Sequence, residues 1–379
     1  MGRIKFLLER GADVEAVALM FASEAGHCEA ARVLVERGGA NVSAARTSDG
    51  MTALMWASEN GHLEIARCLV ERGGANVNAV MTDDGYTALM WASQNGHLEI
   101  VRCLVEHGGA NANAVRTTDG FTALMWASQQ GNLEIVRCLV ERGGANANAA
   151  TTTDGGTALM LASQNGHLEI VRFLVERGGA NVNAATPDNG QTALMLASQI
   201  GRLDLVRFLV ERGGANGNAA RTDDGSTALI WASANGHLEI VRFLIESGGA
   251  NVNAAMTTDG MTALIWASQE GHLEIVRCLI ERGHASLLLT DSAGATPLTI
   301  ASECGHLEIA RLLLQRGALV NAAQALCGRT ALILASQSGH AAIVRLLLEH
   351  GALKHLFCHD GHTARDSAAD HPLVLAALA

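Results

Sequence analysis

The chain has 379 residues, of which 49% are apolar and only 17% are charged, so it can bury a large core and is not disordered as a whole. Its 38 acidic and 27 basic residues give a formal net charge of −11, which argues against a general nucleic-acid-binding protein, because such binding depends on neutralising phosphates. No apolar run reaches the length of a membrane span, and charge interrupts the start too soon for a signal peptide. We therefore expect a cytoplasmic protein, with the nucleus as the alternative.

From Val17 onward the chain is an internal repeat, preceded by an irregular segment whose residues 6–10 predict a short helix. The tripeptide Val17-Ala18-Leu19 lies 35 residues before the first Thr-Ala-Leu tripeptide, and the pattern fades at Thr363. Successive copies are 35 residues apart, and the last two intervals are 34. The copies begin at Thr52, Thr87, Thr122, Thr157, Thr192, Thr227, Thr262, Thr296 and Thr330. This spacing predicts ten full units.

Each unit predicts two short helices and an extended loop, as residues 84–120 illustrate. Thr87 is a good N-cap for a first helix, which Gly96 ends. The apolar residues of 98–105 recur at helical spacing and predict a second helix, and two glycines end it. The remaining residues read as a loop that turns at Asp119-Gly120. Neither helix can bury its apolar face alone, so the copies are expected to stack around one continuous core.

Three stretches recur in the units: Thr-Ala-Leu-Met-Trp-Ala-Ser, Gly-His-Leu-Glu-Ile-Val-Arg and Gly-Gly-Ala-Asn-Val-Asn-Ala. They resemble ankyrin repeats, and the resemblance covers nearly the whole chain. It implies an all-α ankyrin-repeat solenoid of helix-turn-helix units with projecting β-hairpin loops, with about ten full repeats and half repeats at the ends. The family's usual period is shorter, so the hairpins here are expected to project further. The family's usual histidine after the leucine is Met or Ile in most units, which adds apolar packing.

The two ends depart from the pattern and set the predicted boundaries. Gly11 lies only six residues before Val17, where the resemblance requires about twelve, so a hairpin is missing. Either the true protein begins upstream or the first unit docks abnormally. We expect an irregular N-terminal half repeat over 1–16, the ankyrin repeat array over 17–361 and a C-terminal capping half repeat over 362–379.

The residues that carry chemistry in other proteins have structural interpretations here. The histidine that follows the helix-one glycine is expected to brace the turn, as the resemblance implies. Four cysteines share one position on the second helix, Cys68, Cys103, Cys138 and Cys278. Phenylalanine or leucine fills this position elsewhere, so we expect a core position and reduced thiols.

The terminal cluster His355, Cys358, His359 and His362 has compact spacing, but it falls where the last hairpin should be. We interpret it as a polar hairpin, with a zinc site as the alternative. No nucleophile–base pair or phosphate loop stands out. We therefore expect no enzymatic activity, no cofactor and no metal.

The resemblance implies a non-enzymatic scaffold that binds a protein partner through its concave face and hairpin tips. All five tryptophans occupy one position of the first helix, where we expect packing between repeats, with partial exposure along the groove as the alternative. The hairpins and the residue before the helix-one threonine vary most between copies. These positions supply the candidate partner-binding residues Arg46, Met51, Met81, Tyr86, Arg116, Phe121, Gln191, Arg221, Met256 and Met261. Neutral drift at exposed sites is the alternative explanation of this variation.

We expect a monomer that binds an unidentified protein, without nucleic acid or membrane insertion. The alternative function is the recognition arm of a larger protein, such as a ubiquitin-ligase adaptor, a kinase or channel fragment, or a host-directed effector.

Overall fold

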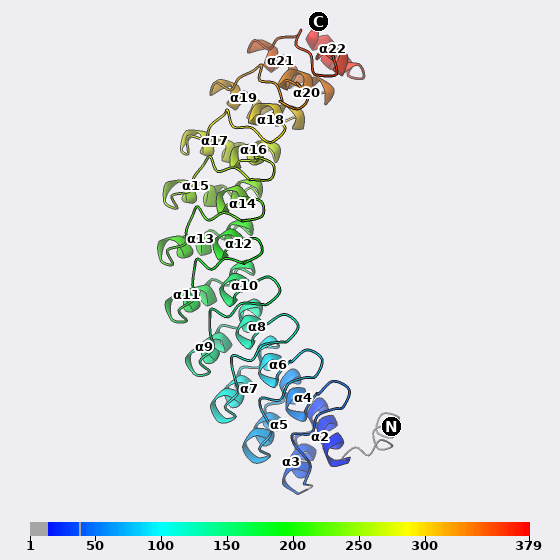
Figure 1. Cartoon of the computed structure of the whole chain (residues 1–379), viewed down its shortest axis with the longest axis vertical. Coiled ribbons are helices and arrows are strands. Elements are labelled where there is room, and N and C mark those ends of the chain that lie inside the picture. Colours follow the sequence, from blue (N-terminus) through cyan, green and yellow to red (C-terminus); the bar gives the residue numbers. More distant parts are fainter. Residues whose placement is uncertain (1–13, 38) are drawn as a thin grey trace. The chain divides into compact units, whose positions relative to one another are not determined.

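The computed structural model describes residues 14–37 and 39–379, so the helix expected over residues 6–10 lies outside the described residues. Contacts between residues divide the chain into two units, Met1–Pro187 and Asp188–Ala379, and each is described by itself (Figure 1). Both units consist of paired short helices joined by long loops. Over the part of the chain that the structure describes, the expected all-α architecture of helix-turn-helix repeats is confirmed.

In the first unit, first and second helices alternate along the chain. Their bounds are α2 Val14–Ala25, α3 Cys28–Glu36, α4 Ala53–Asn60, α5 Leu63–Arg67, η1 Cys68–Arg72, α6 Ala88–Gln94, α7 Leu98–Arg102, η2 Cys103–His107, α8 Ala123–Gln130, α9 Leu133–Glu141, α10 Ala158–Gln164 and α11 Leu168–Glu176. The segments η1 and η2 are π-helical turns that continue α5 and α7.

The second unit repeats the same pairs and ends in a shorter cap. Its helices are α12 Ala193–Gln199, α13 Leu203–Glu211, α14 Ala228–Ala234, α15 Leu238–Glu246, α16 Ala263–Gln269, α17 Leu273–Glu281, α18 Pro297–Cys304, α19 Leu307–Gln315, α20 Ala331–Gln337, α21 Ala341–Glu349, η3 Asp366–Ala368 and α22 Pro372–Leu378. Residues 362–369, which resemble a first helix, form only the single 3₁₀ turn η3. The last helix, α22, packs against α21.

The helix ends lie where the sequence predicts them. The side chain of Thr87 accepts a hydrogen bond from the backbone amide of Met90 at 3.2 Å, and every first helix from α4 to α20 has the same threonine cap. Gly96 has a φ of 80°, a conformation that favours glycine and ends the helix. The predicted N-caps and glycine stops are therefore confirmed.

The core lies between the two helices of each repeat and between neighbouring repeats. In the first unit α4 packs against α6 and α6 against α8, and in the second unit α12 packs against α14. Met55 and Met90, at the position where the family usually has histidine, are completely buried. These methionines therefore add apolar side chains to the core, as expected.

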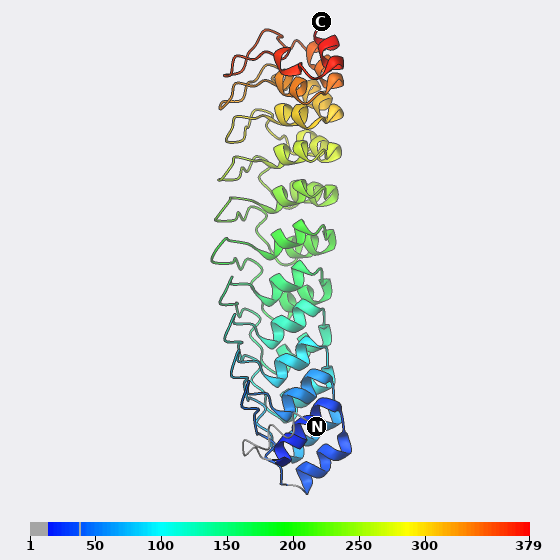
Figure 2. The same cartoon turned by 90° about the vertical axis from the view of Figure 1, so that its right-hand side faces the viewer.

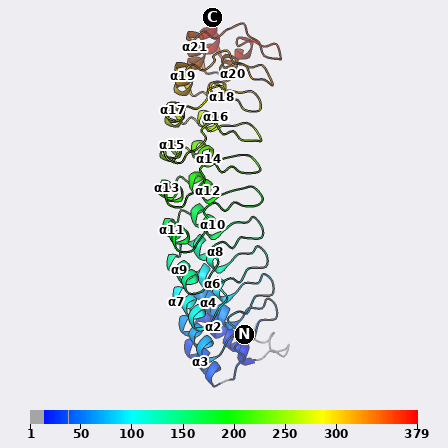
Figure 3. The same cartoon turned by 60° about the vertical axis from the view of Figure 1, so that its left-hand side comes forward.

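The hairpins project from each unit on the side away from the second helices, as Figures 2 and 3 show. Successive hairpins are joined by backbone hydrogen bonds, such as that from Thr82 N to Asp49 O at 2.8 Å and that from Thr117 N to Asp84 O at 2.7 Å. A Cβ added to Gly50 would lie 2.8 Å from the amide of Thr82, and its φ is 78°. Glycine is therefore required at this turn by both conformation and space.

Candidate protein-binding surface

The tryptophans stand at the fourth position of the first helices, facing the hairpins. In the first unit Trp56, Trp91 and Trp126 lie on α4, α6 and α8, and all three are half-buried. The second and sixth helical residues, such as Leu54 and Ser58, are buried on the opposite side of the helix. Both expectations for this position therefore hold in part, because each ring packs against the protein and keeps some solvent exposure.

Four aromatic rings of the first unit form one contiguous group, which we call the aromatic cluster: Tyr86, Trp91, Phe121 and Trp126. The ring centroids of Tyr86 and Trp91 are 4.5 Å apart, and those of Phe121 and Trp126 are 4.8 Å apart. Tyr86 and Trp126 join the two pairs at 6.1 Å across adjacent repeats. The tilted arrangements and spacings lie in the favourable range for aromatic pairs.

Arg116 covers the aromatic cluster from the hairpin. Its guanidinium carbon lies 5.6 Å from the ring centroid of Trp126 and 5.8 Å from those of Tyr86 and Phe121. Its Nε donates a hydrogen bond to Asp119 Oδ1 at 2.8 Å. The guanidinium is therefore held by a carboxylate on one side and by aromatic faces on the other.

The hairpin carboxylates shape the electrostatics of this surface. The hydrogen bond from Arg116 holds the pKa of Asp119 below its ordinary value, and Arg46 lowers the pKa of Asp49 in the same way. Each of these two arginines therefore has its charge balanced by an aspartate of its own hairpin.

Burial raises the pKa of the Tyr86 phenol, whose hydroxyl is hydrogen-bonded to Gln94.

The second unit repeats this arrangement with other residues. Arg221 lies 6.0 Å above the ring of Trp231 and donates from Nε to Asp223 at 3.0 Å. The indole N–H of Trp266 donates to the sulfur of Met256 at 3.3 Å. A long hairpin side chain thus covers the tryptophan in these repeats as well.

The hairpin residue and the first-helix residue vary together between repeats. A hairpin arginine or methionine accompanies tryptophan, and a hairpin threonine accompanies leucine. The pairs are Arg46–Trp56, Met81–Trp91, Arg116–Trp126, Thr151–Leu161, Thr186–Leu196, Arg221–Trp231 and Met256–Trp266. The two positions ten residues apart therefore behave as one structural element.

The structure divides the ten candidate residues into two groups. Met51, Tyr86 and Met261 are 3%, 3% and 6% exposed, so their side chains are core residues and offer almost no surface to a partner. The expectation that the residue before the helix-one threonine presents an anchor is therefore wrong for these three residues, whereas Phe121 and Gln191 occupy the same repeat position and are half-buried. The other candidates are half-buried: Arg46, Met81, Arg116, Phe121, Gln191, Arg221 and Met256.

The recurring histidines hold neighbouring repeats together. Nε2 of His97 lies 3.1 Å from the carbonyl oxygen of Glu59 in the preceding repeat, and His272 makes the same contact with Ala234 at 3.2 Å. The imidazole of His97 also fills the space beside Gly61, where a Cβ would lie 2.7 Å from the ring. The histidines brace the turn as expected, and they do so from the next repeat.

The asparagines of the closing loops join repeats in a second way. Asn113 donates from Nδ2 to Gly144 O at 3.1 Å and accepts at Oδ1 from Asn146 N at 2.7 Å. In the second unit Asn218 bonds to Gly249 and Asn251 in the same manner. Each asparagine side chain therefore makes hydrogen bonds to the backbone of the following repeat.

The cysteines have free thiols, and the residues of the terminal His/Cys cluster lie apart from one another. All eight cysteines lie in the described residues and carry free thiols. His355, Cys358, His359 and His362 do not converge: Cys358 is buried, His355 is exposed, and His359 Nδ1 lies 3.0 Å from Leu326 O.

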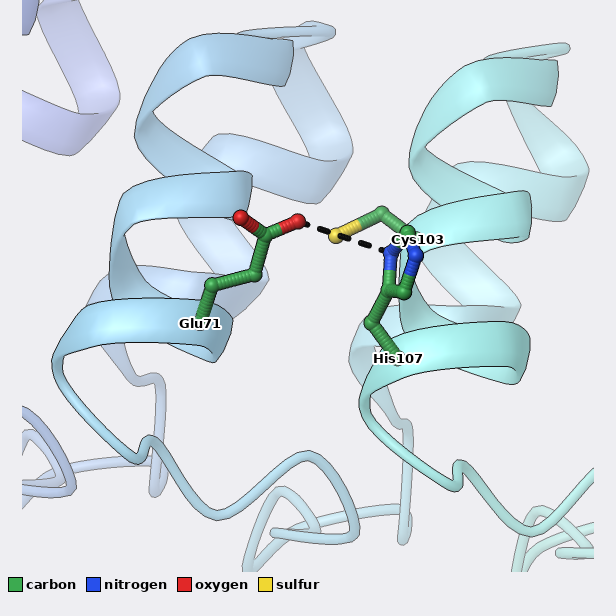
Figure 4. A group of neighbouring side chains, drawn as sticks. All are labelled: Glu71, Cys103 and His107. Carbon is green, nitrogen blue, oxygen red and sulfur yellow. Dashed lines mark ion pairs between the residues drawn. The ribbon is translucent and has the colours of Figure 1, made fainter.

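A different group of potential ligands does converge, and it was missed from the sequence. Within residues 14–37 and 39–379, the one group of three or more His, Cys, Asp or Glu side chains with ligand atoms within 4.8 Å of one another is Glu71, Cys103 and His107 (Figure 4). Burial raises the pKa of the Cys103 thiol. The signal in the sequence was His107, which follows a cysteine by four residues at a position where most repeats have arginine.

Two comparisons place these observations among known proteins. A family model described as ankyrin repeats (3 copies) matches overlapping stretches that together cover more than half of the chain. These are residues 2–81, 19–116, 73–151, 109–186, 143–221, 179–256 and 249–324. A model for the single ankyrin repeat matches residues 327–364. No curated protein matches the chain.

Within the described residues, no helix has the length and apolar character to cross a membrane.

Proposed function

Since the chain belongs to the ankyrin repeat family, which indicates a protein–protein interaction scaffold, we propose that its partner binds along the hairpins and the half-buried tryptophans. The residues proposed to contact the partner are Arg46, Met81, Arg116, Phe121, Arg221 and Met256. They are half-buried and lie on the hairpin side of their unit.

The observation that carries this proposal is the arrangement around Arg116. Its side chain is 25% exposed, yet Asp119 and three aromatic rings fix its position before any partner arrives. Ordering a flexible side chain costs roughly 0.5–1.5 kcal/mol on binding, and a fixed anchor avoids much of that cost. Arginine and tryptophan are also the residue types that most often dominate binding energy at protein interfaces.

The paired carboxylates favour a protein over a polyanion as the partner. Arg46, Arg116 and Arg221 each have an aspartate within hydrogen-bonding distance, so the hairpin surface has no excess of positive charge from them. A partner is therefore recognised by stacking, apolar contact and hydrogen bonds, and long-range attraction contributes little.

A variant taken from the chain's own repeats tests this proposal. In the double variant Arg116→Thr with Trp126→Leu, one hairpin pair becomes the threonine–leucine pair that two other repeats already have. The matched control is Arg172→Gln on α11, whose side chain is 49% exposed on a second helix. Crosslinked pull-down from the source cell with quantitative mass spectrometry should capture a protein with wild type and the control, and at least tenfold less of it with the double variant. Equal capture by all three would contradict the proposal.

A further inference from the structure

Three side chains of different chemistry meet between two second helices of the first unit. The ligand atoms of Glu71, Cys103 and His107 all lie within 4.8 Å of one another, and His107 Nδ1 is 3.5 Å from Glu71 Oε1. Figure 4 shows the carboxylate, the sulfur and the imidazole pointing toward a common point. Thiolate, imidazole and carboxylate are the three ligand types that zinc uses in proteins. We propose that these residues bind a divalent transition-metal ion, with Zn²⁺ as the ion that fits best.

Backbone packing fixes the geometry of this site. Cys103 and His107 both lie on η2, four residues apart, so their side chains project from the same face of the helix. Glu71 lies on η1 of the preceding repeat, which packs directly against η2. The three ligands therefore meet without any movement of the helices, and a bound ion would link two adjacent repeats.

The other repeats supply an internal comparison. The same three positions recur with arginine in place of histidine in the sets Glu36–Cys68–Arg72, Glu106–Cys138–Arg142 and Glu246–Cys278–Arg282. In these sets the guanidinium pairs with the glutamate, as Arg142 does with Glu106 at 3.1 Å. A guanidinium has no lone pair available for a metal, because it stays protonated in proteins. At position 107 histidine therefore supplies a nitrogen ligand, where the equivalent arginines form only an ion pair with the glutamate.

The burial pattern sets access to the site and its selectivity. Cys103 is only 2% exposed, whereas the side chains of Glu71 and His107 are 40% and 56% exposed. An ion can therefore enter from solvent past Glu71 and His107, and Cys103 supplies a buried sulfur ligand beneath them. A thiolate together with an imidazole selects zinc-like ions over Mg²⁺ and Ca²⁺, which prefer oxygen ligands. Arg67 Nε lies 3.7 Å from the same carboxylate oxygen of Glu71, and the ion would displace this contact.

Cobalt is a suitable probe, because Co²⁺ substitutes for Zn²⁺ and its bond to a thiolate gives a charge-transfer absorption. Titration of the reduced full-length protein with Co²⁺ should show one thiolate-bound ion per chain, which Zn²⁺ displaces. His107→Arg should weaken binding by more than tenfold, because losing a ligand costs at least as much as the roughly 10–100-fold lost when a residue that only hydrogen-bonds to a ligand is replaced. Cys103→Phe, the residue at three equivalent positions, should abolish the absorption.

A gain-of-site variant completes the test. Arg142→His places a histidine beside Glu106 and Cys138, so this variant should bind two cobalt ions per chain. Circular dichroism checks folding, and His107→Arg should fold normally because most repeats have arginine there. The proposal is overturned if wild type binds no cobalt through sulfur, or if His107→Arg keeps the absorption, which would assign it to the exposed thiols Cys28 and Cys304. Failure of Arg142→His to gain a second ion would equally overturn it.

Discussion

A buried serine in the first helices should be replaceable by alanine with a gain in stability. Ser128 on α8 is completely buried, and its hydroxyl oxygen has no hydrogen-bond partner. An unsatisfied buried hydroxyl costs about 1–3 kcal/mol. Alanine also has the better helix propensity, by up to about 0.5 kcal/mol. Because only one atom is removed, little cavity is left, and Ser128→Ala should raise the local free energy of unfolding by about 1 kcal/mol or more.

Ser163 on α10 is the matched control, since it occupies the same helix position. Its hydroxyl donates to Leu159 O at 2.8 Å, so Ser163→Ala loses a hydrogen bond worth roughly 0.5–1.5 kcal/mol. Long repeat arrays need not unfold in one step, so the readout is native-state hydrogen exchange of the amides in α8 and α10. A gain of about 1.4 kcal/mol slows exchange about tenfold. The reasoning is refuted if Ser128→Ala speeds exchange, or if the two variants shift exchange equally.

Three further predictions concern a contact between neighbouring repeats, made by Asn113, and two titrating groups, Asp119 and Tyr86. Asn113→Ala should destabilise the following loop by about 1 kcal/mol, seen as faster exchange of the Asn146 amide with little change elsewhere. The lowered pKa of Asp119 contributes stability that is present above its unfolded pKa of about 3.9 and is lost as pH falls toward its folded pKa. Acid unfolding of Arg116→Gln should therefore start at higher pH than that of wild type, and coincident curves would contradict this. Tyr86 is the chain's single tyrosine, and its raised pKa means that the folded state loses stability as pH rises above about 10. Phenolate absorbance should therefore appear together with alkaline unfolding, and an earlier appearance in folded protein would contradict the burial of its hydroxyl.

Most of the fold could be predicted because each repeat encodes its own local structure. The threonine caps, the left-handed glycines and the apolar spacing of the second helices act within about 20 residues of sequence. The structure has them where the pattern places them, as Thr87 and Gly96 illustrate. What the pattern did not predict is how the last segment closes. Residues 362–369 resemble a first helix in sequence, but within them only one 3₁₀ turn forms, Asp366–Ala368.

The site was harder to predict because exposure depends on the neighbouring repeat. The position before the helix-one threonine varies like a surface position, yet Met51 and Tyr86 are buried. The cause is long-range: the amide of Thr82 bonds to Asp49 O, which brings the next hairpin over that position. A position that varies between repeats is therefore either exposed or packed against a second position that varies with it, as tryptophan packs against arginine under the hairpins.

Because the contacts between neighbouring repeats recur along the chain, the residues that differ from their equivalents in other repeats say most about function. Most contacts between neighbouring repeats of a unit combine a histidine–carbonyl contact, an asparagine bound to the next loop and a hairpin amide bond. Asn132 replaces the histidine in one repeat and bonds to Ser93 O. Some residues differ from their equivalents in the other repeats and take no part in these contacts between repeats. Holding neighbouring repeats together does not explain such residues. His107 beside Cys103 is of this kind, because the equivalent sets in other repeats have arginine in place of the histidine. The chain thus contains its own controls, and exchanging residues between repeats separates function from stability more cleanly than alanine substitution.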